Sequence, residues 1–279
     1  MRQIIHWLEA HKCVNALLVL FYSLFVVFAH DFFVQISVNL MNYLSLEVYN
    51  QVVAAIALAL LLGLIYLVSY GIKNRSKVDF AGLVFLMMSI AGLVVHFFVF
   101  TEMNIEFIHA AEFGILALFL YPLVGRFGAA ISFALAIMVI DEWYQYQVLY
   151  PETVEYFDFN DLQLDLLGAG LFLSMLKTFR ILAKKQPVGI AKRSEFYGII
   201  HGALAVIILL SFSFVVPYAY QATDGTWLVL NAIQEPYGFW RVHPEIGSTY
   251  HVLEPVTGLV VVFGICLFYM AMDPISSEK

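Results

Sequence analysis

The run AGLVFLMMSIAGLVVHFFVF, from Ala81 to Phe100, decides the class of protein to which this chain belongs. It contains no Asp, Glu, Lys or Arg. As a helix it would extend roughly 30 Å at 1.5 Å per residue, which matches the hydrocarbon core of a bilayer. A helix also satisfies its own backbone hydrogen bonds, as lipid requires. We therefore predict that this run spans a membrane.

Seven more apolar runs predict a multi-pass protein. They are Val14–His30, Val52–Ile72, Ile105–Val124, Gly128–Tyr150, Asp161–Leu182, Tyr197–Tyr220 and Pro255–Met272. Only 13% of the residues are charged and 62% are hydrophobic, whereas a soluble domain carries roughly 25% charged residues. The sequence thus predicts an all-α transmembrane bundle of about eight helices. Residues 31–44 either continue the first helix or lie at the membrane interface.

The distribution of charge predicts how the bundle is oriented. If the N-terminus is cytoplasmic, 13 of the 14 lysines and arginines fall in inner segments, since only Arg241 lies outside. Most acidic residues, such as Asp31, Glu47 and Glu102, fall on the outer side. This bias predicts cytoplasmic termini and a multi-pass protein of the plasma (inner) membrane, with membrane lipids as partners. The chain has no basic patch, so we expect no nucleic-acid partner.

Three regions follow from this topology. Residues 1–80 hold two helices, residues 81–183 hold four, and residues 184–279 hold a final pair joined by an extracytoplasmic loop at 221–254. The loop is rich in Trp and Tyr. It is either an interfacial aromatic belt or a lid or partner-docking surface, and the sequence leaves both open.

Polar residues interrupt three consecutive spans of the middle region. They are His109 and Glu112, Glu142 and Gln145, and Asp161 and Asp165. The members of each pair are three or four residues apart, so each pair shares one helix face. An ionised residue at the bilayer centre costs about 2.5–3.5 kcal/mol even on the most lenient scale. These residues must therefore face one another or a wet cavity, and all fall in the outer half of the bilayer.

Three kinds of function fit such a site. In the first, clustered carboxylates act as general acid and base, with His109 transferring protons, on an envelope lipid or lipid-linked glycan. In the second, Glu142, Asp165 and His109 bind a divalent cation. In the third, the polar groups join helices, relay protons in a transporter, or belong to a non-catalytic subunit of a membrane complex. Whether the protein is an enzyme stays open.

The polar segments also resemble a known family. HAAEFG (109–114) resembles the His-x-x-Glu-aromatic stretch of VanZ-like proteins, and DEWYQ (141–145) is similar to their Asp-Glu-x-x-Gln motif. DLQLDLLG (161–168) is similar to their closing Asp-x-x-x-Asp/Asn-x-x-Gly stretch. The resemblance covers roughly residues 81–176. It implies a bacterial cell-envelope protein associated with resistance to glycopeptide antibiotics such as teicoplanin.

One departure from the family pattern concerns the loop between the second and third motifs. The family usually has a Pro-Gly-Arg type sequence there. YPETVE (150–155) keeps the proline, has no arginine, and is followed by Asp158. A bound cation or protonated carboxyl groups would then have to balance the acidic residues.

Overall fold

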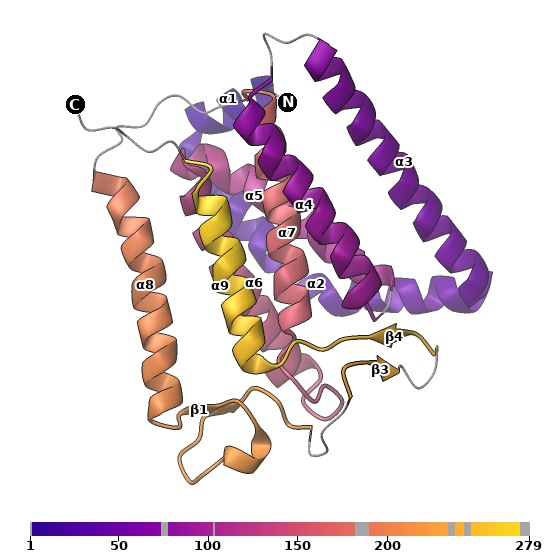
Figure 1. Cartoon of the computed structure of the whole chain (residues 1–279), viewed down its shortest axis with the longest axis vertical. Helices are drawn as coiled ribbons and strands as arrows, with labels where there is room; N and C mark the ends of the chain where they lie inside the picture. The colour runs from indigo at the N-terminus through magenta and orange to yellow at the C-terminus, as the bar shows by residue number, and fades with distance from the viewer. Residues whose placement is uncertain are drawn as a thin grey trace.

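The computed structural model describes residues 2–73, 78–102, 104–181, 190–233, 238–242 and 247–273, and these are mostly helical (Figure 1). The α-helices are α1 (Arg2–Ala10), α2 (Lys12–Leu44), α3 (Leu46–Lys73), α4 (Phe80–Val99), α5 (Phe107–Val124), α6 (Phe127–Tyr144), α7 (Phe159–Thr178), α8 (Ile190–Ser211) and α9 (Pro255–Met270). Short helical segments are η2 (Asn104–Glu106), the π-helix η3 (Gln145–Leu149) and η4 (Ala219–Gln221). The predicted all-α class is confirmed for the described residues.

Four of these helices are long and apolar enough to cross a membrane: α2, α4, α5, and α6 continued by η3. Two of the other predicted spans are more polar or shorter than these four. Helix α7 carries Asp161, Asp165 and Lys177, and α9 has only 16 residues. The full set of about eight spans therefore stays a prediction. So does the cytoplasmic position of the termini, because several of the basic residues that support it (Arg75, Lys77, Lys184, Lys185 and Lys279) lie outside the described residues.

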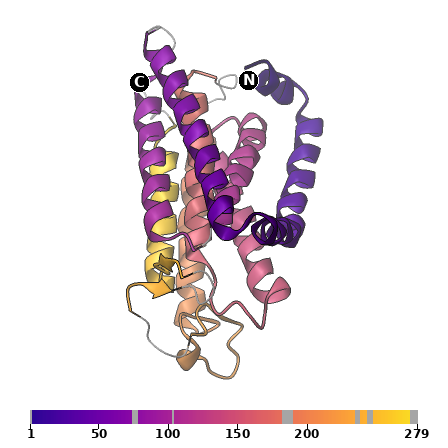
Figure 2. The same ribbon diagram turned by 90° about the vertical axis from the view of Figure 1, so that its right-hand side faces the viewer.

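Helix α7 forms the centre of the bundle, where α4, α5, α6 and α9 surround it (Figures 1 and 2). Small residues let its neighbours come close. A Cβ added at Gly168 would collide with the backbone of Ala110 on α5, and one at Gly170 would collide with the ring of Tyr269 on α9. These two glycines therefore set the spacing of the three helices.

Helix ends are held by side-chain caps. Asp79 accepts a hydrogen bond from Gly82 N (2.7 Å) at the start of α4. Asp273, just after α9, accepts hydrogen bonds from Phe127 N (3.0 Å) and Gly128 N (2.8 Å) at the start of α6. A carboxylate at a helix N-terminus satisfies exposed N–H groups and the helix dipole. Asp273 thus ties the end of α9 to α6.

Residues 31–44 continue the first helix, so α2 runs unbroken to Leu44. Of the two alternatives for this segment, continuation of the helix is therefore confirmed. The C-terminal part of α2 runs across one end of the bundle and leads into α3 (Figures 1 and 2). A buried hydrogen bond of 2.9 Å between Ser37 Oγ and Tyr49 Oη fastens α2 to the beginning of α3. Helix α3 packs mainly on α2 and exposes apolar side chains such as Ile56 and Leu62.

The helix predicted over 197–220 is wrong at its C-terminal end, since α8 stops at Ser211. Ser213 has a positive φ of 58°, and Pro217 could not donate a helical hydrogen bond. The chain instead forms β1 (Val215–Val216), which pairs in parallel with β2 (Leu228–Val229). Farther along, β3 (Arg241–Val242) and β4 (Thr249–Tyr250) pair antiparallel.

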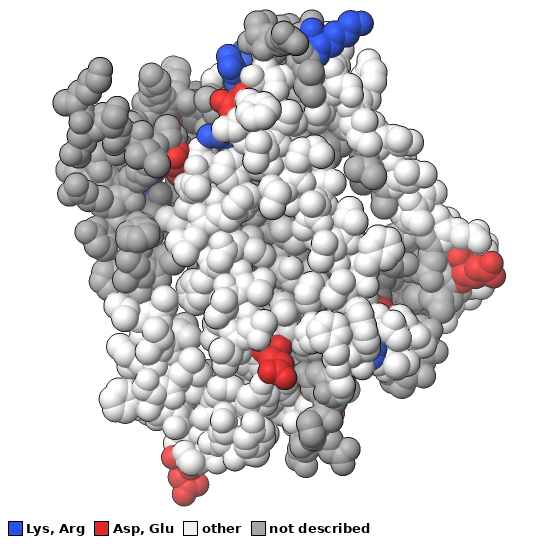
Figure 3. Space-filling view, in the orientation of Figure 1, with Lys and Arg blue, Asp and Glu red and all other residues white. Residues whose placement is uncertain are grey.

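Charged side chains on one face of the molecule are unevenly distributed. Lys and Arg gather mainly at the end where α3 finishes, while Asp and Glu occur toward both ends (Figure 3). Helix α1 and the end of α9 lie at that same basic end, and the β-strands lie at the opposite one (Figure 1). The described chain therefore begins and finishes on one side of the bundle.

Candidate functional site

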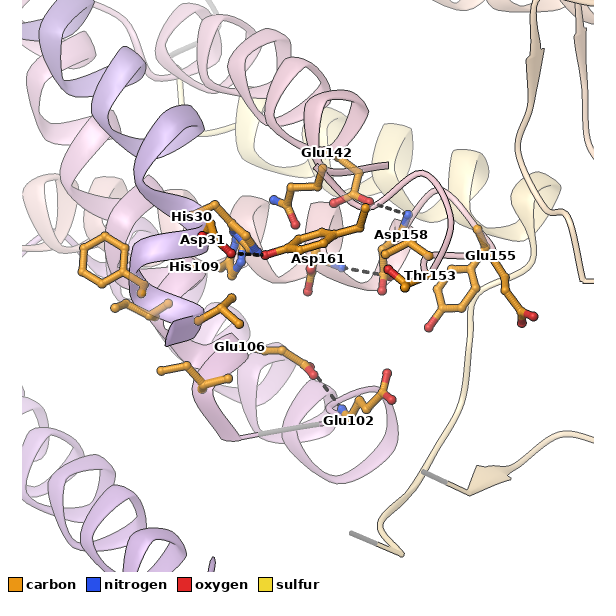
Figure 4. A pocket seen from close by; sticks show the side chains of 18 of the residues that line it. His30, Asp31, Glu102, Glu106, His109, Glu142, Thr153, Glu155, Asp158 and Asp161 are labelled. Atoms are coloured by element: carbon orange, nitrogen blue, oxygen red, sulfur yellow. Dashed lines mark hydrogen bonds between the residues drawn. The ribbon is translucent and has the colours of Figure 1, made fainter. Parts of the chain in front are cut away.

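A cavity of about 510 Å³ opens at the end of the bundle that carries the β-strands (Figure 4). Five of the six predicted site residues line it: His109, Glu112, Glu142, Gln145 and Asp161. They come from α5, α6 with η3, and α7. The spacing argument predicted a single cluster on adjacent helix faces, and the structure brings these five residues to one cavity.

The sixth residue, Asp165, lies behind His109. Its Oδ1 is 3.3 Å from His109 Nδ1, and both side chains are almost completely buried. The contact joins α5 to α7 and depends on the close approach that Gly168 permits. A carboxylate that faces one ring nitrogen fixes the orientation of the imidazole and leaves the other nitrogen for proton transfer.

Glu142 is held against the start of α7. Its Oε1 accepts a hydrogen bond of 2.7 Å from Asp158 N. Asp158 is the N-cap of α7, and its Oδ1 accepts hydrogen bonds from Asn160 N and Asp161 N. Because a helix N-terminus carries partial positive charge, it stabilises carboxylates placed there. Figure 4 shows Glu142, Asp158 and Asp161 side by side on one wall of the cavity.

Gln145 has a partner that the spacing did not predict. Its Nε2 donates a hydrogen bond of 3.2 Å to Asp141 Oδ2, and both side chains are buried. At Gln145 the α-helix changes to the π-helix η3. Such π segments are frequent at functional sites, because they shift the side chains that follow. The next residue after η3 is Tyr150, which reaches into the cavity.

Two ionisable cavity residues come from the first predicted region, and the sequence analysis missed them as site residues. His30 and Asp31 of α2 face the cavity, and the rings of His30 and His109 are 5.3 Å apart. Tyr150 Oη donates a hydrogen bond of 3.0 Å to Asp31 Oδ1. The signal was present, since a His-Asp pair at the end of an apolar run is costly in lipid without a partner.

Glu112 is one of the buried carboxylates that the protein leaves partly unsatisfied. Its side chain is only 9% exposed and it lines the cavity. Within the described part of the chain, Oε1 of Glu112 has no hydrogen-bond partner. A buried carboxylate oxygen without a partner is costly, so a hydrogen-bond donor or cation that reached this oxygen would stabilise it.

The segment that carries β3 and β4 closes one side of the cavity. Arg241 of β3 and Tyr250 of β4 both line it. Arg241 Nη2 lies 3.5 Å from Glu155 Oε2, and its guanidinium lies 5.6 Å from the centre of the Tyr156 ring. A basic group therefore reaches the acidic 150–158 loop from a distant part of the sequence. These contacts favour the lid interpretation for β3 and β4, whereas Trp227 and Trp240 remain exposed.

The predicted metal ligands Glu142, Asp165 and His109 do not form a metal centre in the structure. Among the described residues, no group of three His, Cys, Asp or Glu side chains has an arrangement that could hold a metal ion. The reason is visible in the pairing, since His109 turns toward Asp165 and Glu142 toward the backbone of Asp158.

Replacing Asp158 by asparagine tests the electrostatics of this wall. Burial and the neighbouring Asp161 raise the pKa of the Asp158 carboxyl well above its usual range. The folded state therefore keeps a proton that the unfolded chain loses above about pH 4. The contribution of Asp158 to the free energy of unfolding falls as the pH rises from about 4 toward the raised pKa of the folded state. Asparagine also caps helices but does not titrate. We expect the Tm of Asp158→Asn, relative to wild type, to rise as the pH increases above about 4.

The measurement is thermal unfolding of the purified protein in a neutral detergent across this pH range. Asp224→Asn is the matched control, because Asp224 is exposed in the loop between β1 and β2. Its Tm difference from wild type should not change with pH. A flat profile for Asp158→Asn would show that Asp158 is ionised in the folded state at all these pH values.

Comparison of the chain with protein-family models, with curated proteins and with solved structures found no match in any of the three. The resemblance to VanZ-like proteins thus stays a prediction that rests on the three motifs.

Proposed function

We propose that this chain is a VanZ-like multi-pass protein of a bacterial plasma membrane, with both termini cytoplasmic and the cavity facing outward. The four long apolar helices support its place in a membrane. The gathering of Lys and Arg at the end opposite the cavity supports the orientation, because basic residues favour the cytoplasmic side (Figure 3). The polar side chains lie at one end of the bundle, where an outer-leaflet molecule could reach them.

The activity that the cavity supports best is acid–base chemistry on the polar end of an envelope lipid or lipid-linked glycan. The observation that carries this proposal is the buried pair of His109 and Asp165 beside a cavity lined with carboxyl groups. With Nδ1 facing Asp165, the imidazole would exchange protons through Nε2. Glu142, fixed by the Asp158 N–H, would be the second acid–base group. Groups that only joined helices would not need an open cavity of this size.

The resemblance suggests the assay. Wild type, His109→Gln and Glu142→Gln would be produced in a susceptible Gram-positive host at equal membrane abundance, and teicoplanin sensitivity measured. We expect wild type to protect and both variants to lose protection, because each removes a proton-transferring group while keeping similar size. Asp224→Asn, on the exposed loop, should protect as wild type does.

Each other result has a defined meaning. If all variants protect equally, the polar cluster contributes packing alone, and a non-catalytic membrane subunit becomes the better proposal. If wild type itself gives no protection, the link to glycopeptide resistance is wrong, and a transporter or proton relay built on the same helices would take its place.

A further inference from the structure

We propose that the cavity binds an amphiphile with a positively charged amine head, and that the apolar chain of this ligand leaves the cavity along α2. This inference rests on the proposed function and specifies the class of lipid on which the site acts. Three features of the cavity carry it: its charge, its apolar wall and the unpartnered oxygen of Glu112.

The first feature is the imbalance of charge. Among the described residues, eight acidic side chains line the cavity against a single arginine. The acidic residues are Asp31, Glu102, Glu106, Glu112, Glu142, Glu155, Asp158 and Asp161. Arg241 is itself engaged with Glu155 and Tyr156. Even with Asp158 protonated, seven other acidic side chains of the described cavity lining face one arginine. This balance favours a cationic head over a phosphate or carboxylate head.

The second feature is an apolar wall on one side of the cavity. It consists of Phe33 and Val34 of α2, Ile105 of η2 and Ile108 of α5. In Figure 4 the hydrocarbon side chains gather on one side and the oxygen-bearing side chains on the other. A cavity divided in this way matches a ligand with a polar head and an apolar chain.

The apolar wall continues into the outer surface of α2. Phe25, Phe28 and Phe32 of the same helix are exposed, by 48%, 61% and 60% respectively. In a membrane these rings face lipid. An apolar chain whose head occupies the cavity could therefore follow α2 into the hydrocarbon layer without burying polar surface.

The third feature distinguishes an amine from a metal ion. The Glu112 side chain lines the cavity, and its buried Oε1 has no hydrogen-bond partner in the described part of the protein. A primary ammonium group can donate hydrogen bonds to a carboxylate oxygen, and a quaternary ammonium group attracts it through its positive charge. Neither needs the strict ligand geometry that a metal ion requires. No three acidic or histidine side chains of the described ranges are arranged as metal ligands, and about 510 Å³ is far more space than an ion fills. The geometry therefore favours an organic cation.

Binding to the purified protein in neutral maltoside micelles tests this proposal. The probes are dodecyltrimethylammonium, the anionic dodecylphosphate and the short-chain butyltrimethylammonium, with apparent Kd values from native mass spectrometry. We expect the long-chain ammonium to bind at least about tenfold more tightly than either other probe, since charged contacts and chain burial both contribute. Glu112→Gln should weaken it by about tenfold, and Asp224→Asn should not change it.

A second variant keeps the test decisive if Glu112→Gln does not fold. Val34→Trp fills the apolar wall, so it should weaken binding of dodecyltrimethylammonium without affecting butyltrimethylammonium. Equal binding of the ammonium and phosphate probes would overturn the amine head, and equal binding of long and short ammonium probes would overturn the chain. Either result leaves the acid–base proposal standing, because that is tested separately by His109→Gln and Glu142→Gln.

Discussion

Replacing Gly168 by alanine is expected to destabilise the protein by about 3 kcal/mol, the upper end of the cost of overpacking. The new Cβ would overlap the backbone of Ala110, which belongs to a helix and cannot rotate away as a side chain could. Helices α5 and α7 would have to separate, and the contact of 3.3 Å between His109 and Asp165 would lengthen. Chemical denaturation of the purified protein in mixed micelles measures the loss.

Gly63→Ala is the matched control for this substitution. Gly63 also lies within a helix, α3, but a Cβ there meets no other atom within 4 Å. Alanine is a better helix former than glycine by up to about 1 kcal/mol, so Gly63→Ala should be neutral or stabilising. Equal effects of the two substitutions would contradict the close contact of α5 and α7.

Replacing Asn160 by leucine is expected to cost about 3–5 kcal/mol, because each buried polar group left unpaired costs about 1–3 kcal/mol. Asn160 is buried at the start of α7. Its Nδ2 donates to Phe100 O (3.2 Å) and His251 O (2.8 Å), and its Oδ1 accepts from Leu253 N (3.0 Å). One side chain thus joins the start of α7 to the end of α4 and to the segment before α9.

The loss of stability for Asn160→Leu is measured in the same way, with Asn42→Leu as the control. Asn42 is exposed on α2, so the control should stay within about 0.5 kcal/mol of wild type. The Asn160 variant should also weaken binding at the cavity, because Asp158 and Asp161 flank it on the same wall. Full stability of Asn160→Leu would show that water satisfies these groups in place of the amide.

The cavity draws on all three predicted regions of the chain. His30 and Asp31 come from residues 1–80, the motif residues from 81–183, and Arg241 and Tyr250 from 184–279. The segments outside residues 81–183 are therefore part of the site. Arg241 also supplies the positive charge that the 150–158 loop lacks, from a place that no local motif would indicate.

The sequence by itself determined the helical membrane character of the chain and five residues of the cavity wall. Both follow from local rules, since apolar runs of bilayer length must be helical in lipid and residues three or four apart share a helix face. These rules also indicated that His109, Glu112, Glu142, Gln145 and Asp161 could not face lipid.

Only the tertiary structure decided which groups meet. Asp165 lies behind His109, Asn160 bridges three segments, α2 crosses toward the cavity, and Arg241 reaches Glu155. Each of these contacts joins residues far apart in the chain, and their partners are chosen by helix packing, for which spacing along one helix carries no signal. The end of α8 at Ser211 has the same cause, because the pairing of β1 with β2 is a contact between separate segments.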